Sequence, residues 1–188
     1  MKFLFYVFIS ALLLSCAAAE RPAPQPDVRG LAGKRAEDVE MLFSKAHVLW
    51  KGDSCSNPQE AIRLLDEALA KDGEYAAAWA WRGLANSELG QREEAFDDLT
   101  RAIRLEPGAE NYAFRALVSL RAGVLRAAYR DAEYSLKLNA RQHRAWNVLG
   151  AAALSEEDQP RACANFAKAC SNGNCDYLEK ARSEGLCK

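Results

Sequence analysis

The sequence lacks a surplus of charge of either sign. Its 188 residues include 25 Lys and Arg against 26 Asp and Glu, a formal net charge of −1. Binding to nucleic acid or to an anionic membrane surface needs an excess of Lys and Arg, so this balance argues against both. Hydrophobic residues make up 49% of the chain, as in an ordinary folded protein, which argues against disorder throughout.

Motifs of catalysis and cofactor binding are also missing. The chain contains no G-x-S-x-G, Walker A loop, H-E-x-x-H or G-x-G-x-x-G. Its only two histidines, His47 and His143, are explained as exposed or lightly packed imidazoles. Acidic pairs such as Glu93-Glu94 lie at predicted helix starts, where they complement the helix dipole. We therefore expect no enzymatic activity, no cofactor and no metal site.

The longest apolar run, residues 3–14, is shorter than the roughly 20 residues needed to span a bilayer. One Lys precedes it and small residues follow it, which is the order of a secretory signal peptide. The letters LLSC ending at Cys16 resemble a bacterial lipobox, which makes residues 1–15 a lipoprotein signal peptide and Cys16 the lipidated N-terminus. Alternatively, the run AAA at 17–19 fits ordinary signal peptidase, which would remove residues 1–19 and leave a soluble periplasmic protein.

The residues after Cys16 indicate where the protein is placed. By resemblance to Gram-negative lipoproteins, a residue other than Asp at Ala17 implies sorting to the outer membrane, facing the periplasm. Residues 16–35 contain three prolines spaced two apart and no apolar periodicity. Such a segment favours extended conformations, and we interpret it as a tether.

A repeat of about 34 residues organises the rest of the chain. Trp79 is followed by Tyr112 and Trp146, at steps of 33 and 34 residues, and small residues keep the same steps. Each copy holds two stretches with helical spacing, and no stretch alternates with period two, so we expect helices and no strands.

This pattern resembles the tetratricopeptide repeat (TPR). The resemblance implies an all-α, right-handed α-solenoid of about four TPR helix pairs plus a C-terminal capping helix. We expect repeats at 76–108, 109–142 and 143–174, a degenerate first repeat at 36–75 with an inserted loop at 53–56, and a cap at 175–188. The second copy meets the family pattern with Trp79, Arg82-Gly83, Ala95, Leu99, Ala102 and Pro107, the third with Tyr112, Arg115-Ala116 and Ala128, and the fourth with Trp146, Leu149-Gly150, Ala153, Ala162, Phe166 and Ala169.

Two Arg–Asp pairs recur at matching repeat positions. Arg82 is expected to pair with Asp98, and Arg115 with Asp131, with each Arg stem packed on its neighbours. Exposed pairs of this kind contribute little to stability.

Four cysteines cluster at the C-terminal end, where export would make disulfides the default. Cys175 and Cys187 flank the predicted capping helix, whose length of roughly 14–18 Å exceeds the ~7 Å Cα limit of a bridge. If the cap folds back antiparallel, the natural pairs are Cys163–Cys187 and Cys170–Cys175. The crossed pairing and a Cys₄ zinc site are the alternatives, although the zinc site lacks a C-x-x-C motif.

Cys55 is the cysteine left over, on the inserted loop. It is read as a free thiol, as an unreactive exposed residue, or as a link that joins copies of the chain into an oligomer.

In the TPR family the first helices of successive repeats line a concave groove that receives an extended peptide or a helix. A partner groove is implied at Ala80, Leu84, Ser87, Ala113, Leu117, Leu120, Arg121, Asn147, Ala151 and Leu154. Alternatively, Leu117 and Leu120 pack between helices, or the Pro-rich arm fills the groove. Leu117→Glu is expected to abolish partner binding and leave thermal unfolding nearly unchanged.

These features together predict a non-catalytic protein–protein interaction adaptor or scaffold of the bacterial cell envelope. Its partner would be a segment of another envelope protein. The chain itself would be anchored to the membrane by lipid and would bind no nucleic acid. The alternative is a soluble periplasmic Sel1-like cysteine-rich protein with enzymatic or cell-wall-binding activity. The repeat length near 34 and the placing of four cysteines in the last repeat and cap argue against it.

Overall fold

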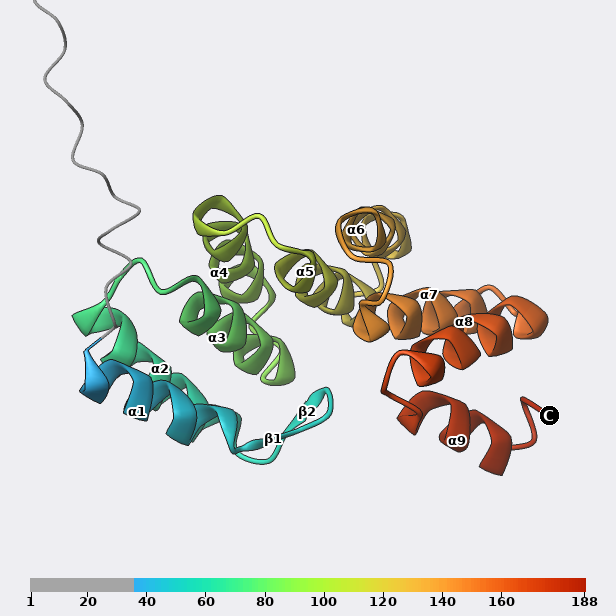
Figure 1. The fold of residues 1–188 in the computed structure, drawn as a ribbon, viewed down its shortest axis with the longest axis horizontal. Coiled ribbons are helices and arrows are strands. Elements are labelled where there is room, and N and C mark those ends of the chain that lie inside the picture. The colour runs from blue at the N-terminus through green and yellow to red at the C-terminus, as the bar shows by residue number, and fades with distance from the viewer. Residues whose placement is uncertain (1–35) are drawn as a thin grey trace, which may run out of the picture. The chain divides into compact units, whose positions relative to one another are not determined.

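The computed structural model describes residues 36–188, in which it places nine helices and one two-stranded sheet (Figure 1). The predicted signal peptide, Cys16 and the Pro-rich tether lie outside the described residues. The elements are α1 (Glu37–His47), β1 (Trp50–Lys51), β2 (Ser54–Cys55), α2 (Pro58–Lys71), α3 (Ala76–Glu88), α4 (Arg92–Leu105), α5 (Ala109–Arg121), α6 (Leu125–Leu138), α7 (His143–Ser155), α8 (Gln159–Ser171) and α9 (Asp176–Ser183).

The helices form an all-α solenoid of successive pairs, which confirms the predicted fold class. Helices α1 and α2, α3 and α4, α5 and α6, and α7 and α8 pack as neighbours, and α9 packs on α8 (Figure 1). The first helices also contact one another, α3 with α5 and α5 with α7. They begin at Ala76, Ala109 and His143, which are 33 and 34 residues apart.

Small residues allow the two helices of a pair to approach closely. A Cβ added to Gly83 would lie 3.0 Å from the carbonyl oxygen of Ala95 and 3.0 Å from Leu99 Cγ. A Cβ added to Gly150 would lie 2.4 Å from the ring of Phe166. Close packing therefore favours glycine at these two positions, whereas the third repeat accommodates Ala116 at the matching one.

The recurring Arg–Asp pairs are confirmed. Arg82 Nε donates to Asp98 Oδ2 at 2.9 Å, and Arg115 Nε donates to Asp131 Oδ2 at 2.7 Å. Both aspartates are buried, at 4% and 3% exposure, so each carboxylate depends on its Arg for compensation.

The expectation of no strands is wrong at one place. Trp50 pairs with Cys55 and Lys51 with Ser54 in a short antiparallel hairpin inserted between α1 and α2. Gly52, at φ +61°, takes the first position of the two-residue turn, where type II′ turns use glycine. Strands of two residues are too short to produce a visible alternation, which is why the sequence did not reveal them.

The apolar core has two parts. The larger runs from α1 to α7, and the smaller lies among α7, α8, α9 and the C-terminal end, where Phe166, Leu178 and Ala181 are buried. Between residues 36 and 188, no helix is both long enough and apolar enough to cross a membrane.

Candidate partner-binding surface

Half of the residues predicted to line a partner groove are instead inside the protein. Leu117 is 3% exposed and packs in the larger core, so its assignment to the groove is wrong. The cause is the direct contact of α3 with α5 and of α5 with α7, which buries the side chains between these helices. Those buried are Ala80, Leu84, Ala113, Leu117 and Asn147, those half-buried are Ser87, Leu120, Ala151 and Leu154, and Arg121 is exposed.

The hairpin formed by residues 50–55 reaches helices far along the chain. The backbone oxygen of Asp53 accepts from Arg121 Nη2 at 2.5 Å, and its Oδ1 accepts from Arg144 Nε at 2.6 Å. Its Oδ2 accepts from the Tyr177 hydroxyl at 3.4 Å. The expectation that the Pro-rich arm fills the groove falls outside the described residues; it is this hairpin that contacts Arg121 of the predicted groove.

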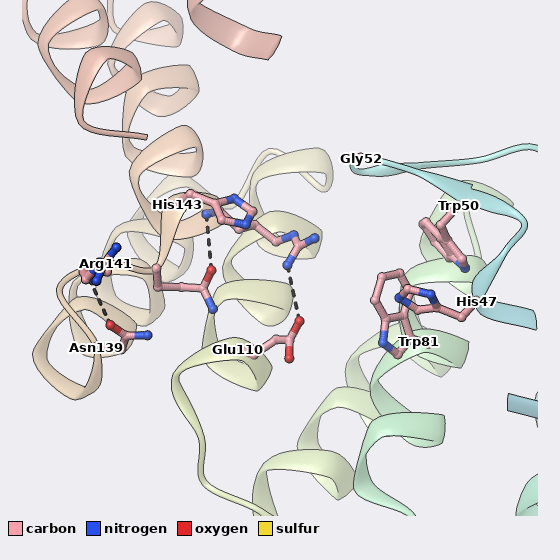
Figure 2. A pocket seen from close by; sticks show the side chains of 10 residues that line it. His47, Trp50, Gly52, Trp81, Glu110, Asn139, Arg141 and His143 are labelled. Atoms are coloured by element: carbon pink, nitrogen blue, oxygen red, sulfur yellow. Dashed lines mark hydrogen bonds and ion pairs between the residues drawn. The ribbon is translucent and has the colours of Figure 1, made fainter. Parts of the chain in front are cut away.

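Beside the hairpin lies an open pocket of about 490 Å³ (Figure 2). Figure 2 shows two walls: His47, Trp50 and Trp81 on one side, and the start of α7 with Glu110 on the other. The pocket is lined by His47, Trp50, Gly52, Trp81, Glu110, Asn139, Arg141, Gln142, His143 and Arg144.

The aromatic wall is held by edge-to-face contacts. Trp81 lies 4.5 Å from the ring of His47 and 5.0 Å from that of Trp50, centroid to centroid. Its other neighbour is Phe114, at 5.1 Å, which anchors the cluster in the core. Such contacts fix ring orientation and leave the ring of the exposed His47 open to a partner.

Each wall of the pocket includes one residue with a buried hydrogen-bonding atom that has no partner. Burial, followed by the Arg144 charge, lowers the pKa of His143, so its ring is neutral at pH 7. His143 Nδ1 and Trp50 Nε1 are two of only four buried side-chain atoms without a hydrogen-bond partner in the described part of the chain. Both belong to residues that line this pocket. Unsatisfied buried groups of this kind carry a free-energy cost in the folded state.

The cysteines form the pairs predicted from the cap geometry. Cys163 is bonded to Cys187 and Cys170 to Cys175, with Cα separations of 5.6 and 4.0 Å. Within residues 36–188 there is no cluster of three side chains able to hold a metal ion. Cys55 is free and half-buried, and burial raises the pKa of its thiol.

The raised pKa of the Tyr177 hydroxyl leads us to expect that stability depends on pH. Burial, followed by the charge of Asp53, raises the pKa of Tyr177 from 10.0 to about 12. The folded chain therefore keeps this proton where the unfolded chain loses it, and its stabilising contribution is lost as the pH rises from 10 to 12. Tyr177→Phe should flatten the fall of the unfolding free energy across that window, measured by denaturant titration. Equal slopes in the wild type and in the Tyr177→Phe protein would contradict the assignment.

Repeated antiparallel helix pairs, with an aromatic near the start of the first helix of each of three pairs and small residues where the helices meet, define the tetratricopeptide-repeat fold, and the chain has this fold. Solved structures with it include TTC0263, a thermophilic TPR protein of Thermus thermophilus, at 22% identity and a TM-score of 0.67 over 80% of this chain and 81% of that one. PilF of Pseudomonas aeruginosa is 17% identical, with a TM-score of 0.61 over 80% and 72% of the two chains.

A third similar structure is YrrB, described as a TPR protein with an unusual peptide-binding site. It is 19% identical, with a TM-score of 0.51 over 78% of this chain and 75% of that one. No protein-family model matches the chain, and no curated protein matches it in sequence. The likeness therefore establishes the fold alone.

The sequence did not reveal the role of the hairpin. The sequence places Asp53 only within an inserted loop and carries no signal for a role of Trp50. The one available signal was the dipeptide Gly52-Asp53, a type that favours tight hairpin turns.

Proposed function

We propose that this chain is a non-catalytic adaptor that binds a segment of another envelope protein at the pocket beside the hairpin. The observation that carries the proposal is the open pocket of about 490 Å³, lined by aromatic rings on one side and by polar and charged side chains on the other. Ring faces suit an apolar side chain, while a nearby polar wall suits the backbone amides of an extended segment. The TPR fold supports this class of function, because in that family the inner surface receives peptides or helices.

The proposed localisation is the periplasmic face of the outer membrane, with a lipid on Cys16 as the anchor. The lipobox-like run before Cys16 supports lipidation. Two disulfides in a chain of this size support an oxidising compartment. Nothing in the described residues favours the Sel1-like alternative, since the helix pairs step by 33 and 34 residues.

The test is partner capture by in-cell crosslinking, with wild type and two variants. The pocket variant carries His47→Ala and Arg141→Ala, both at exposed positions that line the pocket. The control carries Tyr134→Ala and Leu138→Ala, which are 43% and 47% exposed on α6. We expect wild type and control to capture the same one or two proteins, and the pocket variant to recover them at least about tenfold less, equivalent to about 1.4 kcal/mol.

Two checks accompany this capture experiment. Each variant loses one ring contact, that of His47 with Trp81 or that of Tyr134 with Tyr112, so both should be destabilised by a similar amount of about 0.5–1.5 kcal/mol. Fractionation should place the protein with the outer membrane, and Cys16→Ser should move it to the soluble periplasm. Identical capture by all three proteins would reject the pocket as the binding site.

A further inference from the structure

Asp53 is the point at which four separate parts of the chain meet. Its backbone oxygen and both carboxylate oxygens accept hydrogen bonds from Arg121, Arg144 and Tyr177, which lie 68, 91 and 124 residues away. In a solenoid each repeat ordinarily contacts only its neighbours. The hairpin therefore connects the first repeat to the third, the fourth and the cap.

The Asp53–Arg144 pair is nearly removed from water. The two side chains are 12% and 8% exposed, and the Arg144 guanidinium also lies over the Phe114 ring at 4.4 Å. Breaking a buried pair leaves one charge uncompensated, which costs far more than losing a surface ion pair. Arg144 thus requires an anion at this position, and at present the hairpin supplies it.

Tyr177 is also suited to binding a carboxylate at this position. Its raised pKa, about 12, keeps the hydroxyl protonated, so it can donate to a carboxylate at any physiological pH. Arg121 is shared, since its Nη2 also lies 2.9 Å from Glu88 Oε1. Two guanidinium groups and one hydroxyl thus converge on a single carboxylate-bearing residue.

The hairpin itself is weakly held. Two strands of two residues have no independent stability in water, so its position depends on the contacts of its tip and of Trp50. The tip residue Asp53 can therefore move away from Arg144 while Trp50 stays packed on Trp81 of α3, provided that another carboxylate takes the place of Asp53.

We propose that Asp53 is an internal ligand, and that the partner segment presents one Asp or Glu side chain that replaces it between Arg144 and Tyr177. This inference rests on the proposed function, since it names the chemistry of the partner at that site. Arg144 lines the partner pocket and is thus reachable from it. A neutral partner would remove the short ion pair of Arg144 and leave only the longer contact with Glu110, and is rejected on that ground.

The surrounding charges limit the partner to a single acid here. Glu110 Oε1 lies 3.7 Å from Arg144 Nη1, and Glu88 neutralises part of Arg121. A run of acidic residues would meet both carboxylates and be repelled. Because the hairpin is tethered, it competes at a high effective concentration, so the partner must add contacts with the aromatic wall.

The site is tested by chemical rescue of the purified protein, with sodium formate as the probe. Asp53→Ala should lower the unfolding midpoint by about 6 °C or more, because it leaves the buried Arg144 with only its longer contact to Glu110, at 3.7 Å. Formate should restore at least half of that loss, whereas sodium chloride at the same concentration should not. Asp97→Ala, which removes an exposed carboxylate, should show neither the loss nor the recovery. Asp53→Asn, of nearly the same size, checks that the effect follows the charge.

Capture then tests the partner. In the crosslinking experiment, Asp53→Ala should raise recovery of the wild-type partners at least threefold, because the internal competitor is gone. No formate-specific recovery would overturn the anion site, whatever the pocket variant does. Recovery by formate without a gain in capture would overturn the replacement of Asp53 by a partner acid. The pocket variant tests the proposed function independently of these two results. Failure of the proposed function can therefore be told apart from failure of the Asp53 proposal.

Discussion

Replacing Leu117 by glutamate is expected to destabilise the whole repeat array by about 3–5 kcal/mol, because the new carboxylate would be buried without a partner. Leu117 is 3% exposed and packs among the first helices, in the larger core. The loss combines the removal of a buried aliphatic side chain with the desolvation of a charge. Denaturant unfolding monitored by circular dichroism measures it.

Leu138→Glu is the matched control for this substitution. Leu138 is 47% exposed at the end of α6, so the same chemical change should cost less than about 0.5 kcal/mol. Partner capture by Leu117→Glu should fall together with the folded fraction. Unfolding close to wild type with capture abolished would instead return Leu117 to the partner surface.

The misplacement of Leu117 shows how far the repeat pattern carries a prediction. The 33- and 34-residue steps fix which residues share a helix face, because every copy places small residues where its two helices meet. They do not fix how closely neighbouring first helices approach. Ala80 and Ala113 are completely buried, and their small size lets α3 and α5 close over positions that the resemblance assigns to a groove.

Local pairs were predictable and distant ones were not. Arg82 and Asp98 are 16 residues apart on two helices of one repeat, so the helical period places them together. Asp53 and Arg144 are 91 residues apart, and their meeting depends on the curvature of the solenoid and on a turn of two residues. Neither the curvature nor the turn can be predicted from the spacing of hydrophobic residues. The same reasoning explains why the pocket beside the hairpin was not predicted.

Removing the disulfide between Cys163 and Cys187 is expected to cause the second large loss of stability. It joins two residues 24 positions apart and closes a segment that contains most of α8 and all of α9. Restricting an unfolded loop of this size stabilises the folded state by about 3 kcal/mol. Helix α9 has only eight residues, too few to persist without tertiary support. Replacing both cysteines by serine should therefore lower stability by about 3 kcal/mol and melt α9 first.

The loss should be local, because the cap shares the smaller core with α7 and α8 and not with α3 or α4. Hydrogen exchange should show protection lost at α9 and retained in α3 to α6. The matched control, Cys170→Ser with Cys175→Ser, removes a bridge of five residues and should cost only about 2 kcal/mol. Because melting α9 withdraws Tyr177 from Asp53, the first double variant should also loosen the hairpin, and the control should not. Retained protection in α9 after loss of Cys163–Cys187 would show that apolar packing alone holds the cap.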